Sequence, residues 1–375
     1  MVCPHILTLD LININNINNI RGLITPFNLH KNLKMKKLIT ILLVVLGTTF
    51  IYGQDSLTTD TSKLSFEGSA DIYYRRNLST SATDVAPATS FANNNGFSLG
   101  MFNLIGSYDT KNTGFVADLV FGPRGEDAVF LSSGNSSIVN QLYAYWDVND
   151  NLTFTMGNFN TFLGYEVISP TGNFNYSTSY MFSYGPFSHS GLKADFNLSE
   201  NLTGMLAVLN ATDATEYNPT NLNTLGAQLG YKDTYLNAIY GKQDTISKAT
   251  FQVDLTAGYD LSEKFYLGIN TTYNETDGSG FYGVALYPQY NFGKLTTGVR
   301  AEYFNTTGDI IKTTGNVIES YITDADFIGL TTTLDYAIDN LNLKLEYRLD
   351  KSSQIAFEQK DNLSSIVLAA VYSFN

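Results

Sequence analysis

From residue 63 to the C-terminus, apolar and polar side chains alternate with a period of two. In LNLKLEYRLD, residues 341–350, leucine or tyrosine occupies every odd position and a polar side chain occupies every even one. The same split recurs in residues 64–75 and 251–260. Side chains of a strand point alternately to opposite faces, so the pattern predicts strands with one apolar and one polar face.

The connections between these runs are of two kinds, which alternate strictly along the chain. One kind is short and rich in Asn, Asp and Gly, as tight turns require, at residues 109–112, 149–151, 199–201, 232–234, 260–264, 291–294 and 338–340. The other kind is mostly longer, at residues 76–95, 122–137, 162–187, 211–222, 305–325 and 351–362, with shorter members near 242–248 and 276–279. A soluble sandwich has turns of similar character at both ends, whereas an outer-membrane barrel has short periplasmic turns and long extracellular loops.

The number and length of the runs agree with a barrel. We count about sixteen strands of roughly 9 to 11 residues, an even number that places both chain ends on the short-turn side. Lipid offers no partner for backbone polar groups, so a spanning sheet must close on itself. The predicted fold is therefore all-β: a transmembrane antiparallel up-and-down β-barrel over residues 63–375.

An apolar run near the N-terminus predicts export. LITILLVVLGTTFIYG, residues 38–53, follows two lysines and is shorter than a membrane-spanning helix. We interpret residues 35–53 as a signal peptide, with a membrane anchor as the alternative. Residues 1–34 are interpreted as a mis-assigned start or a disordered extension, and residues 54–62 as a short N-terminal segment. The expected location is the outer membrane of a Gram-negative cell.

Composition argues against several classes of function. A net charge of −13 disfavours a nucleic-acid partner. The only cysteine is Cys3, so the exported chain has no disulfide and no cysteine for a lipid anchor. His189 is the only histidine after the signal peptide, and the adjacent serines of its strand would point to the opposite face. We therefore expect no enzymatic activity, no metal site and no cofactor.

One long connection is unusually aromatic. NFNYSTSYMFSYGPFSHSGLKADF, residues 173–196, mixes tyrosine and phenylalanine with hydroxyl and amide side chains. Such residues suit a wet lumen that still needs packing. We expect loop 162–187 to fold into the barrel, with its tyrosines on the inner wall and its Ser, Asn and Thr side chains facing water. The alternative is an ordinary surface loop outside the barrel.

Charged side chains at inward-facing positions are the candidates for a pore constriction, because a water-filled lumen selects solutes by the charges that line it. The candidates are Glu166, Arg124, Lys193, Arg300, Glu302 and Arg348. Glu166, on the infolded loop, is expected to face the four basic residues. As alternatives, Arg124 could be a solvated loop residue, and Lys344, Glu346 and Arg348 could form cross-strand ion pairs.

Several segments carry a resemblance to a known family. They are GYEVISPTGNFNYSTSYMFSYGPFSHSGLKAD (164–195), DLVFGPR (118–124), LGAQLGY (225–231), GVRAEYF (298–304) and LAAVYSF (368–374). Together they resemble the OmpL-like β-barrel porins, over nearly all of residues 63–375. The resemblance implies an outer-membrane barrel that passes small solutes, without assigning a substrate. Phe374 resembles the terminal aromatic read by the barrel-insertion machinery, although Asn375 follows it.

The sequence thus predicts an outer-membrane porin that lets small hydrophilic solutes diffuse passively through a charged, water-filled lumen. The alternative is a closed structural or adhesive barrel acting through its extracellular loops. Expected partners are outer-membrane lipid and lipopolysaccharide, small solutes and the insertion machinery. A homotrimer is compatible with a barrel of this size, and acidic loops could also bind divalent cations. The acidic excess predicts a weak preference for cations.

Overall fold

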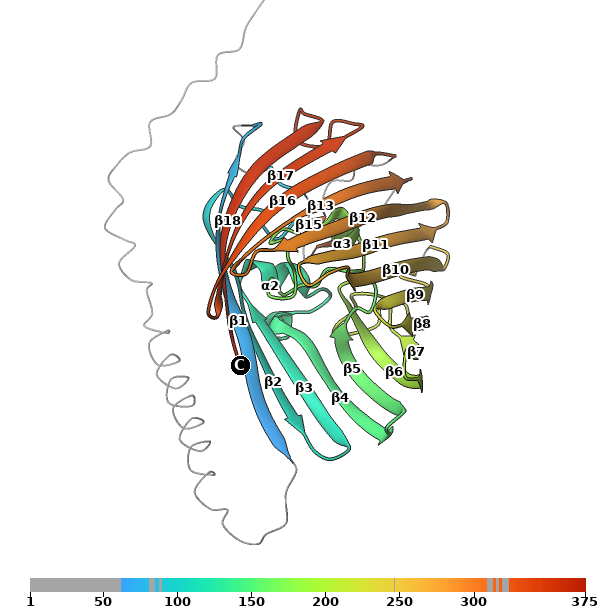
Figure 1. The fold of residues 1–375 in the computed structure, drawn as a ribbon. Helices are drawn as coiled ribbons and strands as arrows, with labels where there is room; N and C mark the ends of the chain where they lie inside the picture. The colour runs from blue at the N-terminus through green and yellow to red at the C-terminus, as the bar shows by residue number, and fades with distance from the viewer. Residues whose placement is uncertain are drawn as a thin grey trace, which may run out of the picture. The chain divides into compact units, whose positions relative to one another are not determined.

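The strands close into one ring, as the alternation predicts (Figure 1). The computed structural model describes residues 62–80, 85–87, 90–245, 247–308, 313–314, 317–318 and 324–375. The predicted N-terminal extension, the signal peptide and residues 54–61 lie outside this range. No helix in the described part of the chain is long and apolar enough to cross a membrane.

Sixteen strands form the ring, each paired antiparallel with its neighbours, and β1 pairs with β18 to close it. They are β1 (Lys63–Asn77), β2 (Gly96–Asp109), β3 (Thr113–Phe121), β4 (Val139–Asn149), β5 (Leu152–Asn160), β6 (Ser188–Ser199), β7 (Leu202–Leu209), β8 (Thr224–Tyr231), β9 (Thr234–Gly241), β10 (Thr250–Asp260), β11 (Phe265–Thr276), β12 (Ser279–Asn291), β13 (Leu295–Thr307), β16 (Asp326–Ile338), β17 (Leu341–Ser352) and β18 (Asn362–Phe374). Two short strands, β14 (Thr313–Thr314) and β15 (Val317–Ile318), form a separate ladder. Helical turns occur at α2 (Pro123–Ala128), η2 (Gly134–Ile138) and α3 (Tyr180–Tyr184).

The alternation of short turns and longer loops is confirmed except between β11 and β12, where two residues connect the strands at the end expected to carry longer loops. The expected strand length is wrong in detail, because the strands run from 8 residues in β7 to 15 in β1. Strands β11 to β18, together with β1 and β2, have 12 to 15 residues, leaving aside the separate β14 and β15. The longest strands therefore lie next to one another on one side of the barrel wall. Most of the contacts described below are made on that side.

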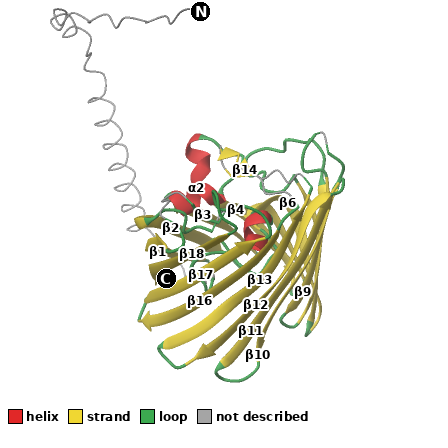
Figure 2. Ribbon diagram, turned by 90° about the horizontal axis from the view of Figure 1, so that it is seen from above, coloured by secondary structure: helices red, strands yellow, loops and turns green. Residues whose placement is uncertain are grey.

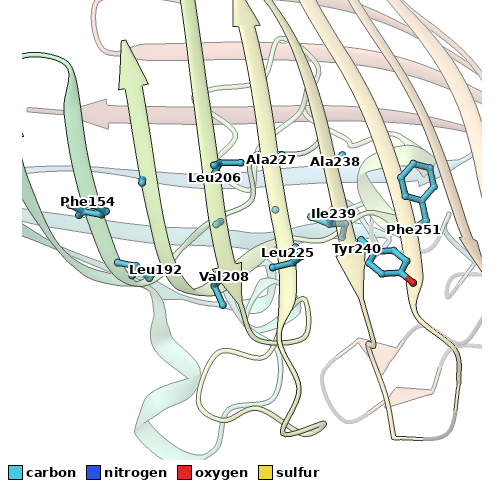
Figure 3. Close-up of a pocket in the computed structure, with 13 residues that line it drawn as sticks. Phe154, Leu192, Leu206, Val208, Leu225, Ala227, Ala238, Ile239, Tyr240 and Phe251 are labelled. Carbon is cyan, nitrogen blue, oxygen red and sulfur yellow. The ribbon is translucent and has the colours of Figure 1, made fainter. Parts of the chain in front are cut away.

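The two faces of the wall differ as the alternation requires. The outer face is apolar and includes a shallow hollow of about 590 Å³ across β5 to β10, where Leu192, Leu206 and Leu225 line the wall (Figure 3). Such a surface is what lipid-facing strands present. On the inner face, polar and charged side chains are buried, among them Asp71, Asp254 and Arg300. Their burial inside a barrel means that something fills the lumen.

The apolar core lies inside the ring. Tyr180 packs against Phe304 and Phe327, with ring centroids 5.7 and 4.8 Å apart. A second cluster joins Phe182 and Phe187, whose rings stack at 4.6 Å. Three of these five aromatics come from the connection between β5 and β6, and α3 of that connection lies within the ring (Figure 1). Figure 2 shows the same barrel from above.

Candidate functional site: the lumen and its infolded loop

The connection between β5 and β6, residues 161–187, folds into the lumen, as expected from its aromatic content. Its tyrosines pack on the inner wall, and Tyr176 and Tyr180 are buried. The expectation that its small polar side chains face water is wrong: Ser177, Thr178 and Ser179 are buried too. The reason is that charged side chains of the wall reach this segment and satisfy its backbone, which excludes water from it.

Over residues 176–181 of this loop, three carboxylates accept hydrogen bonds from the backbone N–H groups, two of them from the wall and one from the loop itself. Glu346 accepts from Tyr176 (2.6 Å) and Ser177 (3.1 Å), Glu166 from Ser179 (2.7 Å), and Glu302 from Tyr180 (3.0 Å) and Met181 (2.9 Å). Hydrogen bonds to an ionised acceptor are stronger than neutral ones. Between residues 176 and 181, only the N–H of Thr178 binds another backbone group, the carbonyl of Ser90.

Cationic side chains bind the loop's carbonyl groups in the same way. Lys344 donates to Asn173 O (2.6 Å) and Phe174 O (2.9 Å), Arg300 to Ser177 O (2.5 Å), Arg348 to Thr178 O (2.7 Å), and Arg124 to Ile168 O (2.8 Å). Side chains thus bind both the N–H groups and the carbonyl groups of this loop segment. Buried backbone groups must be paired, and here the wall supplies the partners that a sheet would otherwise give.

Two further contacts fix the loop. Glu166 Oε1 and Arg300 Nη1 form a buried ion pair of 2.7 Å. The Tyr176 hydroxyl donates to Asp71 at 2.5 Å. Burial, and the nearby Asp71 carboxylate, raise the pKa of the Tyr176 phenol well above its usual value, so this phenol keeps its proton and donates.

Glycines of the wall leave space for the loop's large side chains. An added Cβ at Gly268 would collide with the Tyr165 ring, and one at Gly226 would lie 2.9 Å from Phe162. Tyr165 in turn stacks on Tyr287, with centroids 4.3 Å apart. These inward-facing positions have no side chain because the loop occupies that space.

The structure brings five of the six candidate residues together and separates the sixth. Glu166, Arg124, Arg300, Glu302 and Arg348 are buried around the loop. The alternative for Arg124, a solvated loop residue, is wrong, because α2 turns it inward onto the loop's carbonyls. The alternative of cross-strand pairing applies to Lys344, which lies 3.5 Å from Asp335 of β16.

Lys193 lies on β6, apart from that group. It pairs with Asp195 at 2.7 Å, and the two side chains are 25% and 39% exposed. They line a cavity of about 470 Å³ together with Tyr143, Tyr145 and Gln228. Lys193 is therefore the one candidate that faces open space.

Two more cavities adjoin this one beneath the loop. A cavity of about 500 Å³ along β1 to β5 shares Gln141 and Asn160 with the Lys193 cavity. A cavity of about 510 Å³ beside β17 shares Thr171 and Ser373 with the β1–β5 cavity. All three reach residues next to the short turns, so polar space extends below the loop at the short-turn end of the barrel.

His189 packs inside the barrel. It is fully buried, its Nε2 lies 3.0 Å from Thr161 Oγ1, and its ring lies 4.9 Å from that of Phe162. Within the described residues, no group of three or more His, Cys, Asp or Glu side chains is placed to hold a metal ion.

Sequence reasoning missed several residues that hold the loop. Asp71 and Glu346 occupy inward positions of the alternation, so the pattern marked them, but only their long-range partners give them a role. Nothing local distinguishes Gly268 from other glycines.

A family model described as "Putative beta-barrel porin-2, OmpL-like" matches residues 63–374. No curated protein matches the chain. Among solved structures, the outer-membrane channel DcaP of Acinetobacter baumannii has a TM-score of 0.56 and 11% identity, covering 84% of this chain and 99% of its own. The trimer form of OmpT from Vibrio cholerae has a TM-score of 0.53 and 11% identity, covering 84% and 100%. At such low identity these structures support the barrel fold alone.

Proposed function

Because the chain belongs to the OmpL-like family of β-barrel porins, we propose that it is an outer-membrane channel for passive diffusion of small hydrophilic solutes. The supporting observation is the polar space beneath the infolded loop, where the Lys193 side chain remains partly exposed. Solutes pass along β4 to β8 in this proposal, because the loop is clamped to the opposite wall. No energy coupling is needed.

The proposal revises where the constriction lies. Five of the predicted constriction residues serve to hold the loop, and the narrow part of the path runs between that loop and the Lys193–Asp195 pair. A paired lysine and carboxylate on one wall orient polar solutes by their opposite charges.

Single-channel recording in planar bilayers tests this function. The purified barrel should give stepwise conductance. Lys193→Glu should change the ion selectivity of the channel without abolishing the conductance. Silence from protein that is folded, as judged by its β-type circular dichroism, would overturn the proposal.

The second candidate is a closed structural or adhesive barrel acting through its extracellular loops. Its supporting observation is the apolar packing inside the ring. Tyr180 of the loop is buried among aromatics of the wall, and Phe182 is buried among aromatics of the connections, with Met101 and Val120 of the wall. The same recordings separate the two functions, because a closed barrel carries no current.

Export and assembly complete the proposal. We propose cleavage of the signal peptide before Gln54, which N-terminal sequencing of the outer-membrane protein would test. A homotrimer is supported by the existence of a trimer form of the structurally similar OmpT. Cross-linking in native membranes would test it, and the expected outer-membrane lipid contacts fall on the apolar outer face.

A further inference from the structure

A β-bulge in β4 builds a polar cluster on the lumen side. Asp118 of β3 pairs with Gln141, and Leu119 pairs with Val139, so Asn140 is an extra residue in β4. The bulge turns the consecutive side chains of Asn140 and Gln141 to the same carboxylate. Bulges commonly re-aim side chains in this way at functional places.

Three amide groups of this cluster donate hydrogen bonds to the Asp118 carboxylate. Asn140 Nδ2 donates to it at 2.6 Å and Gln141 Nε2 at 2.9 Å, and Asn103 Nδ2 donates to it as well. These donors occupy three of the carboxylate's about four lone-pair positions, which leaves little room for a cation. The cluster instead directs amide groups toward the β1–β5 cavity, whose volume is about 500 Å³.

Two polar atoms at this cavity make no hydrogen bond. Among the described side chains that line it, Ser69 Oγ and Asn140 Oδ1 are buried without a partner, and their residues are 2% and 4% exposed. Buried polar atoms are nearly always paired, and an exception calls for a ligand or another explanation. Asn140 Oδ1 can only accept a hydrogen bond, whereas the Ser69 hydroxyl can both donate and accept one.

The charge of the cavity narrows the class of ligand. Its described lining contains the carboxylates of Glu67, Asp118 and Asp339 and includes no lysine or arginine. Anions are therefore repelled. Apolar side chains, among them Val167 and Phe374, also line the cavity and offer a surface for C–H groups. A hydroxyl group both donates and accepts, which is what the two unpartnered atoms require together.

We propose that the β1–β5 cavity binds a neutral polyhydroxylated solute, of the class of a mono- or disaccharide, with Asn140 Oδ1 and Ser69 Oγ as hydrogen-bond partners. This inference rests on the proposed passage of solutes and names their chemical class. The cavity volume lies within the range of small-molecule sites, about 300–1,000 Å³. The site lies on the short-turn side of the loop.

Ion-current recording with maltose as the probe tests the proposal. Maltose should interrupt the open-channel current in a concentration-dependent way, whereas gluconate, an anion of related structure, should have little effect. Ser69→Ala should weaken the maltose effect about three- to tenfold, the value expected for one lost hydrogen bond. Asn140→Ala should weaken it at least as much, because it also removes the amide that donates to Asp118. Ser365→Ala is the matched control, an inward-facing serine of β18 outside this cavity.

The outcomes separate this inference from the proposed function. An absence of conductance overturns the passage of solutes, whereas conductance that maltose does not alter overturns only the sugar site. Equal interruption by gluconate, or equal losses in the control variant, would also overturn it. If the variants fail to fold, swelling rates of liposomes that contain wild-type protein decide the point. Maltose should then enter with saturable kinetics, and entry that follows solute size alone would contradict the site.

Discussion

At the scale of single residues, the buried charged side chains of the lumen bind chiefly to the backbone of the infolded loop. Arg300 contacts both the Glu166 carboxylate and the Ser177 carbonyl, and its side chain is fully enclosed. Each charge in this group has a partner of opposite sign or a backbone dipole, which is what permits its burial. Removing one of these charged side chains therefore destabilises its buried partner as well as the loop.

We expect Arg300→Met to destabilise the barrel by about 3–5 kcal/mol, because it leaves Glu166 buried without a counter-charge. The combined variant R300M/E166Q should recover much of this loss, since neither charge then remains. Urea-induced unfolding of the lipid-embedded barrel, followed by circular dichroism, measures both.

A matched control is the exposed pair of Lys248 and Asp277. Lys248→Ala should leave the unfolding curve unchanged, because solvent screens such a pair. A loss in this variant as large as that of Arg300→Met would show that the method does not resolve the buried pair.

At the scale of elements, large side chains of the loop fill the space beside wall glycines, which have no side chain. Tyr165 occupies the space beside Gly268 and stacks on Tyr287, and its hydroxyl donates to Tyr266 at 3.0 Å. The fit depends on shape rather than on charge, so it can be tested by adding a single methyl group.

Gly268→Ala should displace the Tyr165 ring and loosen the loop, at a cost of about 1–3 kcal/mol for overpacking. Single-channel conductance should rise, and the loop should become more sensitive to protease. Gly329→Ala is the control, because its added Cβ would meet its neighbours at ordinary contact distances of 3.5 Å or more. Equal effects of the two substitutions would contradict the proposed fit.

Most of the strands could be predicted from the sequence, and the docking of the loop only in outline. The alternation in residues 341–350 and the Asn- and Asp-rich turns are local signals, so they identified β17 and its start, and its end to within two residues. The Glu346–Tyr176 contact joins residues 170 positions apart, and no local pattern marks it. The bulge at Asn140 was also hidden, because one extra residue reverses the alternation without a distinctive sequence.

At the scale of the whole molecule, charge is unevenly distributed inside the barrel. Arginines 124, 300 and 348 are buried around the infolded loop, and Arg75 is buried where it donates to carbonyls of the β1–β2 connection. Acidic residues such as Glu67 and Asp339 line the space below it. The open part of the lumen is therefore more acidic than the sequence's inward positions suggest.

We expect a preference for cations, which Lys193→Glu should strengthen about twofold or more, because lumen charges set the local ion concentration. The reversal potential in a KCl gradient measures this ratio. Lys264→Glu, in the turn between β10 and β11, should leave it unchanged. Preference for anions in the wild type would mean that Lys193 dominates the open path.

The position of the infolded loop in the chain also bears on biogenesis. Its anchors in β13 and β17 are synthesised some 120 to 170 residues after the segment they hold. Non-local contacts form late and slowly, since a long stretch of chain must first be brought together. The aromatic loop therefore lacks its partners until the second half of the barrel has been synthesised. Chains that are still incomplete at that stage are the most exposed to aggregation.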